Sequence, residues 1–351
     1  MSGSAAPGAR VRDEGVTLAH GSGGRAMQDL IADVLGGGFG CADRGPLEDQ
    51  ARIDLADLAR GGDRLAFTTD SYVVDPLFFP GGDIGTLAVN GTINDLAVSG
   101  ARPLHLSCSL ILEEGFPIAD LRRVAESMRA AAAAAGVDIV TGDTKVVHRG
   151  AADKLFVNTS GIGVIRTGVD IRAGRARPGD RVLVNGCLGD HGVAILAARD
   201  DLALDVPVES DTRALHGLVD ALLAACPDVH CLRDATRGGL GTVANELAQA
   251  SGVGLALDET ALPVREAVKG VSEILGLDPL YYANEGRLVA IVPGDHAEAA
   301  LAAMRAHPAG AEAAIVGEVL AGPPGRVTMR TGFGGERVVG MPVGDQLPRI
   351  C

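Results

Sequence analysis

The stretch Arg64-Leu65-Ala66-Phe67-Thr68-Thr69-Asp70 runs out into Ser71 and shows the pattern on which the fold is built. Its aliphatic, aromatic and β-branched residues predict a β-strand that ends at a carboxylate. A Pro- and Gly-rich turn at 80–83 follows, and a helix is expected over Thr86 to Val98. A strand, an acidic loop and a helix in succession indicate an α/β architecture.

Later segments repeat this α/β rhythm on either side of an interruption at Gly174, Pro178 and Gly179. The first half is expected to hold strands at 104–112, 137–140 and 155–165 and a helix at 118–135. The second half is expected to hold strands at 181–185, 254–257 and 288–292 and helices at 193–198, 212–225, 239–250 and 297–306. We therefore expect a two-domain α/β (α+β) fold. Its parts are a segment with a Gly-rich loop (1–40), two domains (41–170 and 175–338) and a mobile tail (339–351).

The composition excludes several classes of protein. The net charge is −14 and no run of Lys and Arg stands out, which argues against nucleic acid as a partner. No stretch has the apolar length of a membrane span or a signal peptide, so a cytoplasmic protein without a membrane partner is expected. The cysteines are few and scattered, which is not the pattern of a disulfide framework. Cys226, His230 and Cys231 could bind zinc, but no second ligand pair follows at a matching spacing.

Several acidic residues share one kind of position. Asp70, Asp143, Asp234 and Glu285 lie at or beyond the end of an expected strand or at a turn that flanks one, where α/β proteins bind ligands. Asp95 joins them from a helix whose polar residues are costly enough to suggest that they face something. Carboxylate oxygens suit Mg²⁺, which commonly arrives with nucleotide phosphates. A turn or cap role explains any one of these residues, but explains the whole set less well.

Three further features are ambiguous from the residues alone. The loop His20-Gly21-Ser22-Gly23-Gly24 opens a helix and could offer backbone N–H groups to a phosphate, although it lacks the P-loop lysine. Lys145 follows Gly142-Asp143-Thr144 and could contact phosphate, act as a base or be a solvated surface lysine. The run 342–351 is too broken for a helix and ends at Cys351, so its thiol is either a delivered nucleophile or part of a frayed end.

A rival interpretation rests on Gly239, Gly241 and Ala244, which fit the glycine pattern of a dinucleotide site, with Asp258 near the distance of a ribose-binding acid. Four residues, Asp234 to Arg237, separate the expected strand from the first glycine. A dinucleotide turn needs that glycine at the end of the strand. A nicotinamide-dependent oxidoreductase is therefore the weaker alternative.

Taken together, the motifs resemble the HypE family of hydrogenase maturation proteins, carbamoyl dehydratases of the PurM-like superfamily, which also includes aminoimidazole ribonucleotide synthetase, selenophosphate synthetase and thiamine monophosphate kinase. The resemblance covers nearly the whole chain. It is carried by the His20 loop, Asp70-Ser-Tyr-Val-Val, Phe78-Phe-Pro-Gly-Gly-Asp-Ile-Gly, Asn90-Gly-Thr-Ile-Asn-Asp-Leu-Ala, Gly142-Asp-Thr-Lys-Val-Val, Arg233-Asp-Ala-Thr-Arg-Gly-Gly-Leu, Asn284-Glu-Gly and Pro348-Arg-Ile-Cys.

The resemblance implies a reaction. Cys351 would receive a carbamoyl group from a carbamoyltransferase, HypF, and ATP would drive its dehydration to a thiocyanate. The cyanide would pass to the iron of [NiFe]-hydrogenase through a HypC–HypD complex, and the protein would be a homodimer through its N-terminal, ATP-binding domain. Lys145 and Glu285 are candidates for orienting and deprotonating the thiocarbamate. Nucleotide and Mg²⁺ are assigned by similarity to Asp70, Asn90, Asp95, Asp143 and Asp234, all four aspartates being metal ligands, with Thr144, His20, Gly21, Gly23 and Gly24 near the phosphates.

Two alternatives stay open at this point. A selenophosphate synthetase or another ATP-dependent kinase of the superfamily would share most motifs, but selenophosphate synthetases carry a reactive residue near the N-terminal glycine loop, and here no cysteine precedes Cys41. A non-catalytic scaffold with the tail as a docking peptide would consume no ATP.

Overall fold

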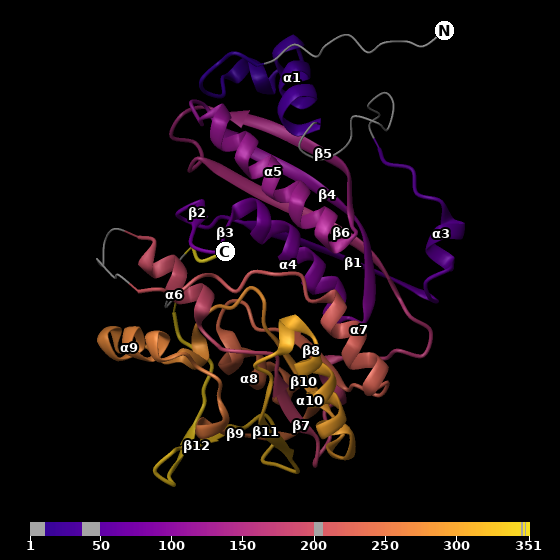
Figure 1. Ribbon diagram of the computed structural model, residues 1–351, viewed down its shortest axis with the longest axis vertical. Helices are drawn as coiled ribbons and strands as arrows, with labels where there is room; N and C mark the ends of the chain where they lie inside the picture. Colours follow the sequence, from indigo (N-terminus) through magenta and orange to yellow (C-terminus); the bar gives the residue numbers. More distant parts are fainter. Residues whose placement is uncertain (1–10, 37–49, 200–205, 345–346, 348) are drawn as a thin grey trace.

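The computed structural model describes residues 11–36, 50–199, 206–344, 347 and 349–351. Two sheets, one in each half of the chain, lie one above the other, and the C-terminus lies between them (Figure 1). None of the helices in this described part is long and apolar enough to cross a membrane.

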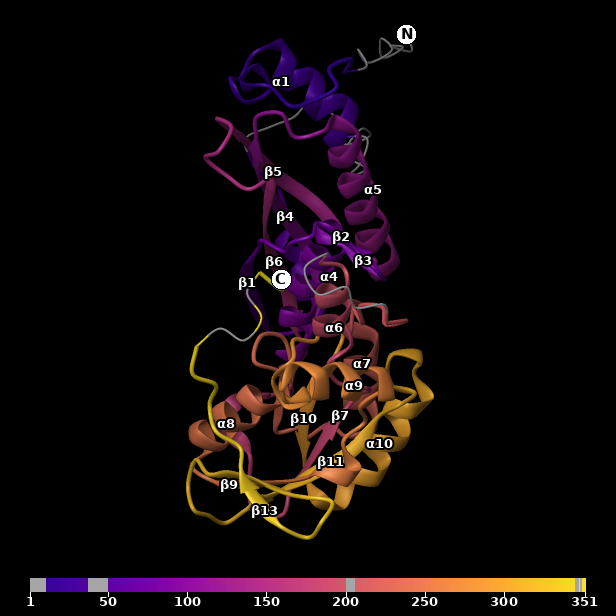
Figure 2. The same cartoon turned by 90° about the vertical axis from the view of Figure 1, so that its left-hand side faces the viewer.

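The first half is a four-stranded sheet in the order β1-β6-β4-β5. Only β4 and β5 run parallel, and α5 connects them. Helices α4 and α5 pack against one face of this sheet (Figure 2). The bounds are α1 Arg25–Leu30, a π-helix Ile31–Gly36, α3 Leu55–Ala59, β1 Arg64–Tyr72, β2 Phe78–Phe79, β3 Gly82–Asp83, α4 Ile84–Val98, β4 Ala101–Glu113, α5 Ile118–Ala135, β5 Asp138–Val147 and β6 Leu155–Ile165.

The second half is a seven-stranded sheet in the order β13-β12-β9-β11-β7-β10-β8. Every residue of β10 is buried, because α8 covers one face of the sheet and α7 and α10 the other. The bounds are β7 Arg181–Val184, α6 Asp190–Ala197, α7 His216–Ala225, β8 Cys231–Asp234, α8 Gly239–Ser251, β9 Gly254–Asp258, α9 Glu266–Leu275, β10 Leu288–Val292, α10 Ala297–Ala306, β11 Ala314–Leu320, β12 Val327–Arg330 and β13 Glu336–Val338.

The mixed α/β fold is as predicted from the sequence, while several element boundaries differ, and two of these differences bear on the site. The strand expected to stop near Val140 continues as β5 to Val147, so Asp143 lies inside a strand rather than beyond its end. The helix expected from Thr212 begins at His216, because the preceding loop is held in another conformation by α4. The exact limits proposed for the two domains stay predictions.

The polar side chains of α4 do face something, as their cost in helix propensity suggested. The Asn94 amide nitrogen donates to the carbonyls of Arg213 at 3.0 Å and Glu285 at 3.2 Å. Its oxygen accepts from the Leu215 N–H at 2.8 Å. Asn90 contributes a bond of 3.3 Å to the Thr212 hydroxyl. Helix α4 therefore ties the first half to the loop before α7 and to the segment that carries Glu285.

A glycine in α4 makes room for a buried tyrosine of β1. A Cβ built on Gly91 would lie 2.2 Å from the Tyr72 hydroxyl oxygen. Tyr72 is 1% exposed, so its ring cannot swing aside into solvent. The close approach of β1 and α4 at this point places the end of β1, with Asp70, beside the polar face of the helix.

We expect Gly91→Ala to lower the free energy of unfolding by about 1–3 kcal/mol, because the new methyl group overpacks this contact. Gly270→Ala in α9 is the matched control: its Cβ would meet no atom within 4 Å, so it should be neutral or stabilising. Urea denaturation of both variants measures the difference. Removing the hydroxyl with Tyr72→Phe should reduce the cost of Gly91→Ala, and an unchanged cost would contradict the proposed clash.

Candidate functional site

The end of the chain lies along the segment that follows β1. The Val73 N–H donates to the Cys351 carbonyl at 3.1 Å, and the Asp75 N–H donates to the Arg349 carbonyl at 3.2 Å. This pairing is antiparallel, and it brings the C-terminus next to β1, α4 and α6 (Figure 2). Ile350 is 3% exposed and belongs to the same apolar cluster as Ile195 and Ala283. The tail is thus docked between the two halves.

The docked thiol of Cys351 lies among acidic side chains. Burial raises the pKa of Cys351 far above its ordinary value, and the negative charges of Glu285, Asp70 and Asp234 raise it further, while Arg237 opposes them. The thiol is therefore protonated at neutral pH. Residues from β1, β8, the Glu285 segment and the tail meet here, so the structure brings together these three predicted acids and the predicted nucleophile.

Glu285 is the most deeply buried member of this group, at 3% exposed. Its main-chain N–H donates to the Asp211 carboxylate at 2.9 Å, but its own Oε1 has no hydrogen-bond partner. Burial, followed by the charges of Asp211 and Asp234, raises the pKa of Glu285 well above its usual range. A buried, unpartnered carboxyl oxygen whose charge acts on the thiol is a candidate to exchange a proton with a group carried on that sulfur.

Asp234 and Asp95 share this environment. Asp234 is the last residue of β8, and burial together with the charge of Asp95 raises its pKa to about 7. Asp95 accepts a hydrogen bond of 2.8 Å from Thr68, yet burial still raises its pKa. We call Asp70, Asp95, Asp211, Asp234 and Glu285 the carboxylate cluster.

The carboxylate cluster fits a cation that brings further ligands with it. Burial, with a further contribution from neighbouring carboxylates, raises the pKa values of Asp234 and Glu285, and Glu285 Oε1 is buried without a hydrogen-bond partner. Among the described residues, however, no three acidic, His or Cys side chains lie close enough to hold a metal ion by themselves. Mg²⁺ usually binds through one or two carboxylates plus phosphate oxygens, and this arrangement is compatible with that mode.

Other predicted site residues lie away from the carboxylate cluster within one chain. Lys145 forms an ion pair of 2.8 Å with Asp143, and both are more than half exposed. They flank buried Thr144 on β5, so they point to the face of the sheet that the helices leave uncovered. Strand β5 is the opposite edge of the sheet from β1, roughly 14 Å away at ordinary strand spacing. The structure does not bring Lys145 to Cys351 within one chain.

The glycine loop lies against β5 and not against the carboxylate cluster. A Cβ on Gly21 would lie 2.8 Å from Val146. His20 is buried, and its Nδ1 bonds the Thr17 N–H at 3.0 Å, so its visible role is local. Gly23 adopts a φ of +77° and Gly24 precedes α1. Thr144, Asp143 and this loop therefore form a second group, at the β5 edge of the sheet. Asn90 is in neither group and bonds Thr212.

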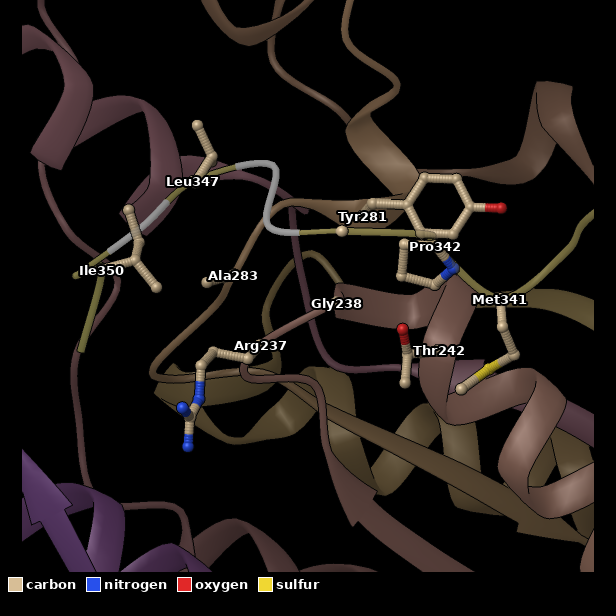
Figure 3. A pocket seen from close by; sticks show the side chains of 10 residues that line it. Arg237, Gly238, Thr242, Tyr281, Ala283, Met341, Pro342, Leu347 and Ile350 are labelled. Atoms are coloured by element: carbon tan, nitrogen blue, oxygen red, sulfur yellow. The ribbon is translucent and has the colours of Figure 1, made fainter.

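A cavity of about 250 Å³ adjoins the tail (Figure 3). One wall is the start of α8, and the other is the tail itself. The lining residues are Arg237, Gly238, Thr242, Tyr281, Ala283, Met341, Pro342, Gly344, Leu347 and Ile350. Arg237 lines this cavity, and its positive charge partly offsets the rise in the pKa of Cys351.

The structure argues against the dinucleotide interpretation. Strands β8 and β9 flank α8 in sequence but are not neighbours in the sheet. A Cβ on Gly239 would lie 2.5 Å from the carbonyl oxygens of Leu280 and Tyr282, so this glycine serves close packing. Asp258 is engaged by Thr260 at 2.7 Å and by an ion pair with Arg330.

Several residues of the site were not singled out from the sequence. Asp211 and Ser210 lie in a polar stretch just before the helix predicted to begin at Thr212. That polar stretch is the signal that could have indicated them. Arg237 belongs to the motif that begins at Arg233, but the motif by itself assigns no role to this arginine. His191 and Arg199, which bind the tail, carry no local pattern that marks them.

The pKa of Asp234 leads to a stability prediction. Because that pKa is about 7 in the folded protein and about 3.9 ordinarily, the stability contribution of Asp234 is present below about pH 4 and is lost as pH rises through 7. Asp234→Asn should therefore shrink the fall in unfolding free energy between pH 5 and pH 8 by about 2 kcal/mol. Urea denaturation at both pH values measures it.

Asp258→Asn is the control for this experiment. Hydrogen bonds from Thr260 and Arg330 lower the pKa of Asp258 to about 2, so its contribution does not change between pH 5 and pH 8. The wild-type difference should persist in that variant. If Asp234→Asn also kept the full wild-type difference, the raised pKa would be refuted.

Family models match both halves of the chain. The N-terminal domain of AIR synthase related proteins matches residues 47–165, and the corresponding C-terminal domain matches residues 177–330. The carbamoyl dehydratase HypE of Rhodobacter capsulatus is 61% identical over 342 residues, which is 97% of this chain and 99% of that protein.

Two solved structures of relatives are also similar. A crystal structure of hydrogenase maturation protein HypE in complex with ATP has a TM-score of 0.90 and 50% identity, covering 95% of this chain and 99% of its own. A HypE–HypF complex contains a chain with a TM-score of 0.77 and 48% identity, covering 79% of this chain and 90% of its own. With identity this high over nearly the full length, the chain belongs to the HypE family of carbamoyl dehydratases within the AIR synthase related proteins.

Proposed function

We propose that this protein dehydrates a carbamoyl group carried on Cys351 to a thiocyanate, using ATP, and so supplies cyanide ligands for the iron of [NiFe]-hydrogenase. The observation that carries the proposal is the position of Cys351, close enough to Glu285, Asp70 and Asp234 for their charges to act on the thiol. The similar HypE that was crystallised with ATP supports ATP as the co-substrate.

The chemistry defines what the site must do. A thiocarbamate, S–C(=O)–NH₂, becomes S–C≡N by losing its oxygen and two nitrogen-bound protons. The amide oxygen is a poor leaving group, so it first takes the terminal phosphoryl group of ATP and then departs within inorganic phosphate, leaving ADP. A base must accept the nitrogen protons as the phosphate leaves.

Glu285 is our candidate for that base. Its charge acts on the Cys351 thiol, and its raised pKa makes its ionised form a stronger base than an ordinary carboxylate. Its main chain is fixed by Asp211 and Asn94, and burial to 3% exposure confines its side chain. Lys145 remains the alternative base and would have to reach the thiocarbamate from elsewhere.

The metal and nucleotide ligands are proposed on the same grounds. Mg²⁺ would be held by one or two of Asp70, Asp95 and Asp234 together with phosphate oxygens, and when bound it neutralises charge on the transferred phosphoryl group. Asp143, Thr144, Asn90 and the loop from His20 to Gly24 remain proposed contacts of the nucleotide. Most of these lie at the β5 edge, which a second copy of the chain could bring to the cluster.

We therefore propose a homodimer through the uncovered face of the first sheet. Leu65, Phe67 and Ile111 are exposed by 58%, 73% and 43%, although each lies in a strand. Apolar side chains gathered on one sheet face favour burial against a partner surface. Asp143 and Lys145 point to the same face, so a second copy of the chain would meet them there.

The remaining partners follow from the reaction. We propose a carbamoyltransferase, HypF, as the donor, supported by the known HypE–HypF complex. A HypC–HypD complex that carries iron would be the acceptor. The cytoplasm is the proposed location, since the described cysteines are all free thiols.

The central experiment is intact mass spectrometry of the C-terminal peptide after reaction with a carbamoyl donor system. The isolated carbamoyl adduct should lose the mass of one water only when ATP and Mg²⁺ are added. Cys351→Ala should bind ATP but form no adduct. Glu285→Gln should form the adduct and bind ATP, but lose water about 10²- to 10⁴-fold more slowly.

Glu318→Gln is the matched control, because Glu318 lies on β11 and pairs with Arg181 away from the tail. It should dehydrate at the wild-type rate. Water loss from Glu285→Gln at the wild-type rate would remove Glu285 as the base, and cyanide formation by Cys351→Ala would overturn the proposed reaction.

The dimer is tested by Phe67→Glu, which places a charge on the uncovered face. We expect sedimentation velocity to show a shift from dimer to monomer at micromolar concentration, because a charge buried in an apolar interface is costly. Ile274→Glu is the control, since Ile274 is 74% exposed on α9 in the other half. A Phe67→Glu protein that stays dimeric would place the interface elsewhere.

A further inference from the structure

The docked tail is held by its main chain and by the side chain of Arg349, whose Nε donates to the Val73 carbonyl at 3.1 Å and whose guanidinium pairs with Asp153. Three consecutive carbonyl groups, those of Arg349, Ile350 and Cys351, all accept hydrogen bonds from the body of the protein. Arg349 O accepts from the Asp75 N–H at 3.2 Å and from Arg199 Nη2 at 3.0 Å. Cys351 O accepts from the Val73 N–H at 3.1 Å. The Cys351 sulfur takes part in none of these bonds, so they do not depend on its chemical state.

The middle carbonyl is held by a histidine. His191 Nε2 lies 2.7 Å from Ile350 O, and because a carbonyl can only accept, Nε2 carries the proton. Nδ1 is then the acceptor for the Ser210 hydroxyl at 2.8 Å. The ring is completely buried and meets Phe79 edge to face, with centroids 5.6 Å apart. Its tautomer and its orientation are therefore both fixed.

The segment that carries Glu285 also fixes the helix that carries His191. The Gly189 N–H, just before α6, donates to the Asn284 side chain at 2.8 Å. One turn later, the Gly192 N–H donates to the Ala283 carbonyl at 3.1 Å. His191 lies between these two contacts, and Glu285 follows Asn284 directly. His191, which donates to the tail, and Glu285, the candidate base, thus lie on segments that are hydrogen-bonded to each other.

We propose that His191 is a positioning residue for Cys351: its bond to the Ile350 carbonyl completes a main-chain clasp that seats the sulfur beside Glu285, whatever group the sulfur carries. The clasp consists of His191, Arg199 and the N–H groups of Val73 and Asp75. The catalytic use of the seated sulfur rests on the proposed function. The clasp itself does not, and it can be measured without nucleotide or carbamoyl donor.

The test is the rate at which iodoacetamide alkylates Cys351 in the full-length protein, read by mass spectrometry of the C-terminal peptide. Docking leaves Cys351 half-buried, which slows alkylation, so the rate follows the undocked fraction. The amide nitrogen of Gln can occupy the place of Nε2, whereas that of Asn reaches only the place of Nδ1. We expect His191→Asn to raise the rate about tenfold, and His191→Gln to stay within about twofold of wild type.

His230→Asn is the matched control, because His230 is also buried and its Nδ1 bonds Asp180 at 2.7 Å, away from the tail. It should leave the alkylation rate of Cys351 unchanged. If His191→Asn and His191→Gln raise the rate equally, or if neither changes it, the proposal is overturned. If neither variant folds, Arg199→Met decides: a severalfold increase supports the clasp, and an unchanged rate refutes it.

A second readout separates the clasp from the reaction. In His191→Asn, water loss from carbamoylated Cys351 should slow while the KM for ATP stays unchanged, and His191→Gln should restore the rate. If the wild-type protein loses no water but the alkylation rates follow the expected order, the proposed function fails and the clasp stands.

Discussion

One buried amide side chain, that of Asn94, holds the site together. It is 2% exposed and uses both its nitrogen and its oxygen, bonding the main chain at Arg213, Leu215 and Glu285. Each of these groups would otherwise be a buried polar group without a partner, at a cost of about 1–3 kcal/mol. Because Asn94 belongs to the first half and its partners to the second, the position of Glu285 depends on how the two halves meet.

The carboxylate cluster is unfavourable as it stands. Burial is the largest cause of the raised pKa values of Glu285, Asp234 and Asp95, and neighbouring acids add to it. Asp211 is partly compensated by Arg287, whose Nε lies 3.4 Å away. Concentrated, unpaired negative charge is a common property of sites that bind cations and move protons. The fold therefore maintains here an electrostatic arrangement that serves a ligand better than it serves stability.

Much of the fold could be predicted from local patterns. The helix Ile118–Ala135 and the strands Leu155–Ile165 and Leu288–Val292 have the predicted ends, because periodicity and flanking glycines mark them clearly. Asp143 was misplaced because pairing of β5 with β4 continues as far as Val147 and overrides the turn signal of Gly142. Such long-range pairing has no local signature.

The site was partly predictable for a related reason. The sequence could indicate four of its residues, because acids and a cysteine at predicted strand ends, turns or the chain end are chemically distinctive: Asp70, Asp234, Glu285 and Cys351. His191 and Arg199 hold the tail through its main-chain carbonyls, and a carbonyl is present at every residue. No sequence pattern could therefore indicate that His191, nearly 160 positions away, bonds Ile350.

The raised pKa of docked Cys351 bears on the order of events. A protonated thiol is a weak nucleophile, so the seated tail is poorly suited to accept a carbamoyl group. Loading would have to take place while the tail is away from the acids, where the thiolate forms more readily. The half-buried position then limits the access of water and electrophiles to the sulfur. The acidic residues around the docked thiol would thus make carbamoylation take place on the undocked tail and dehydration on the docked tail, with no additional regulatory element.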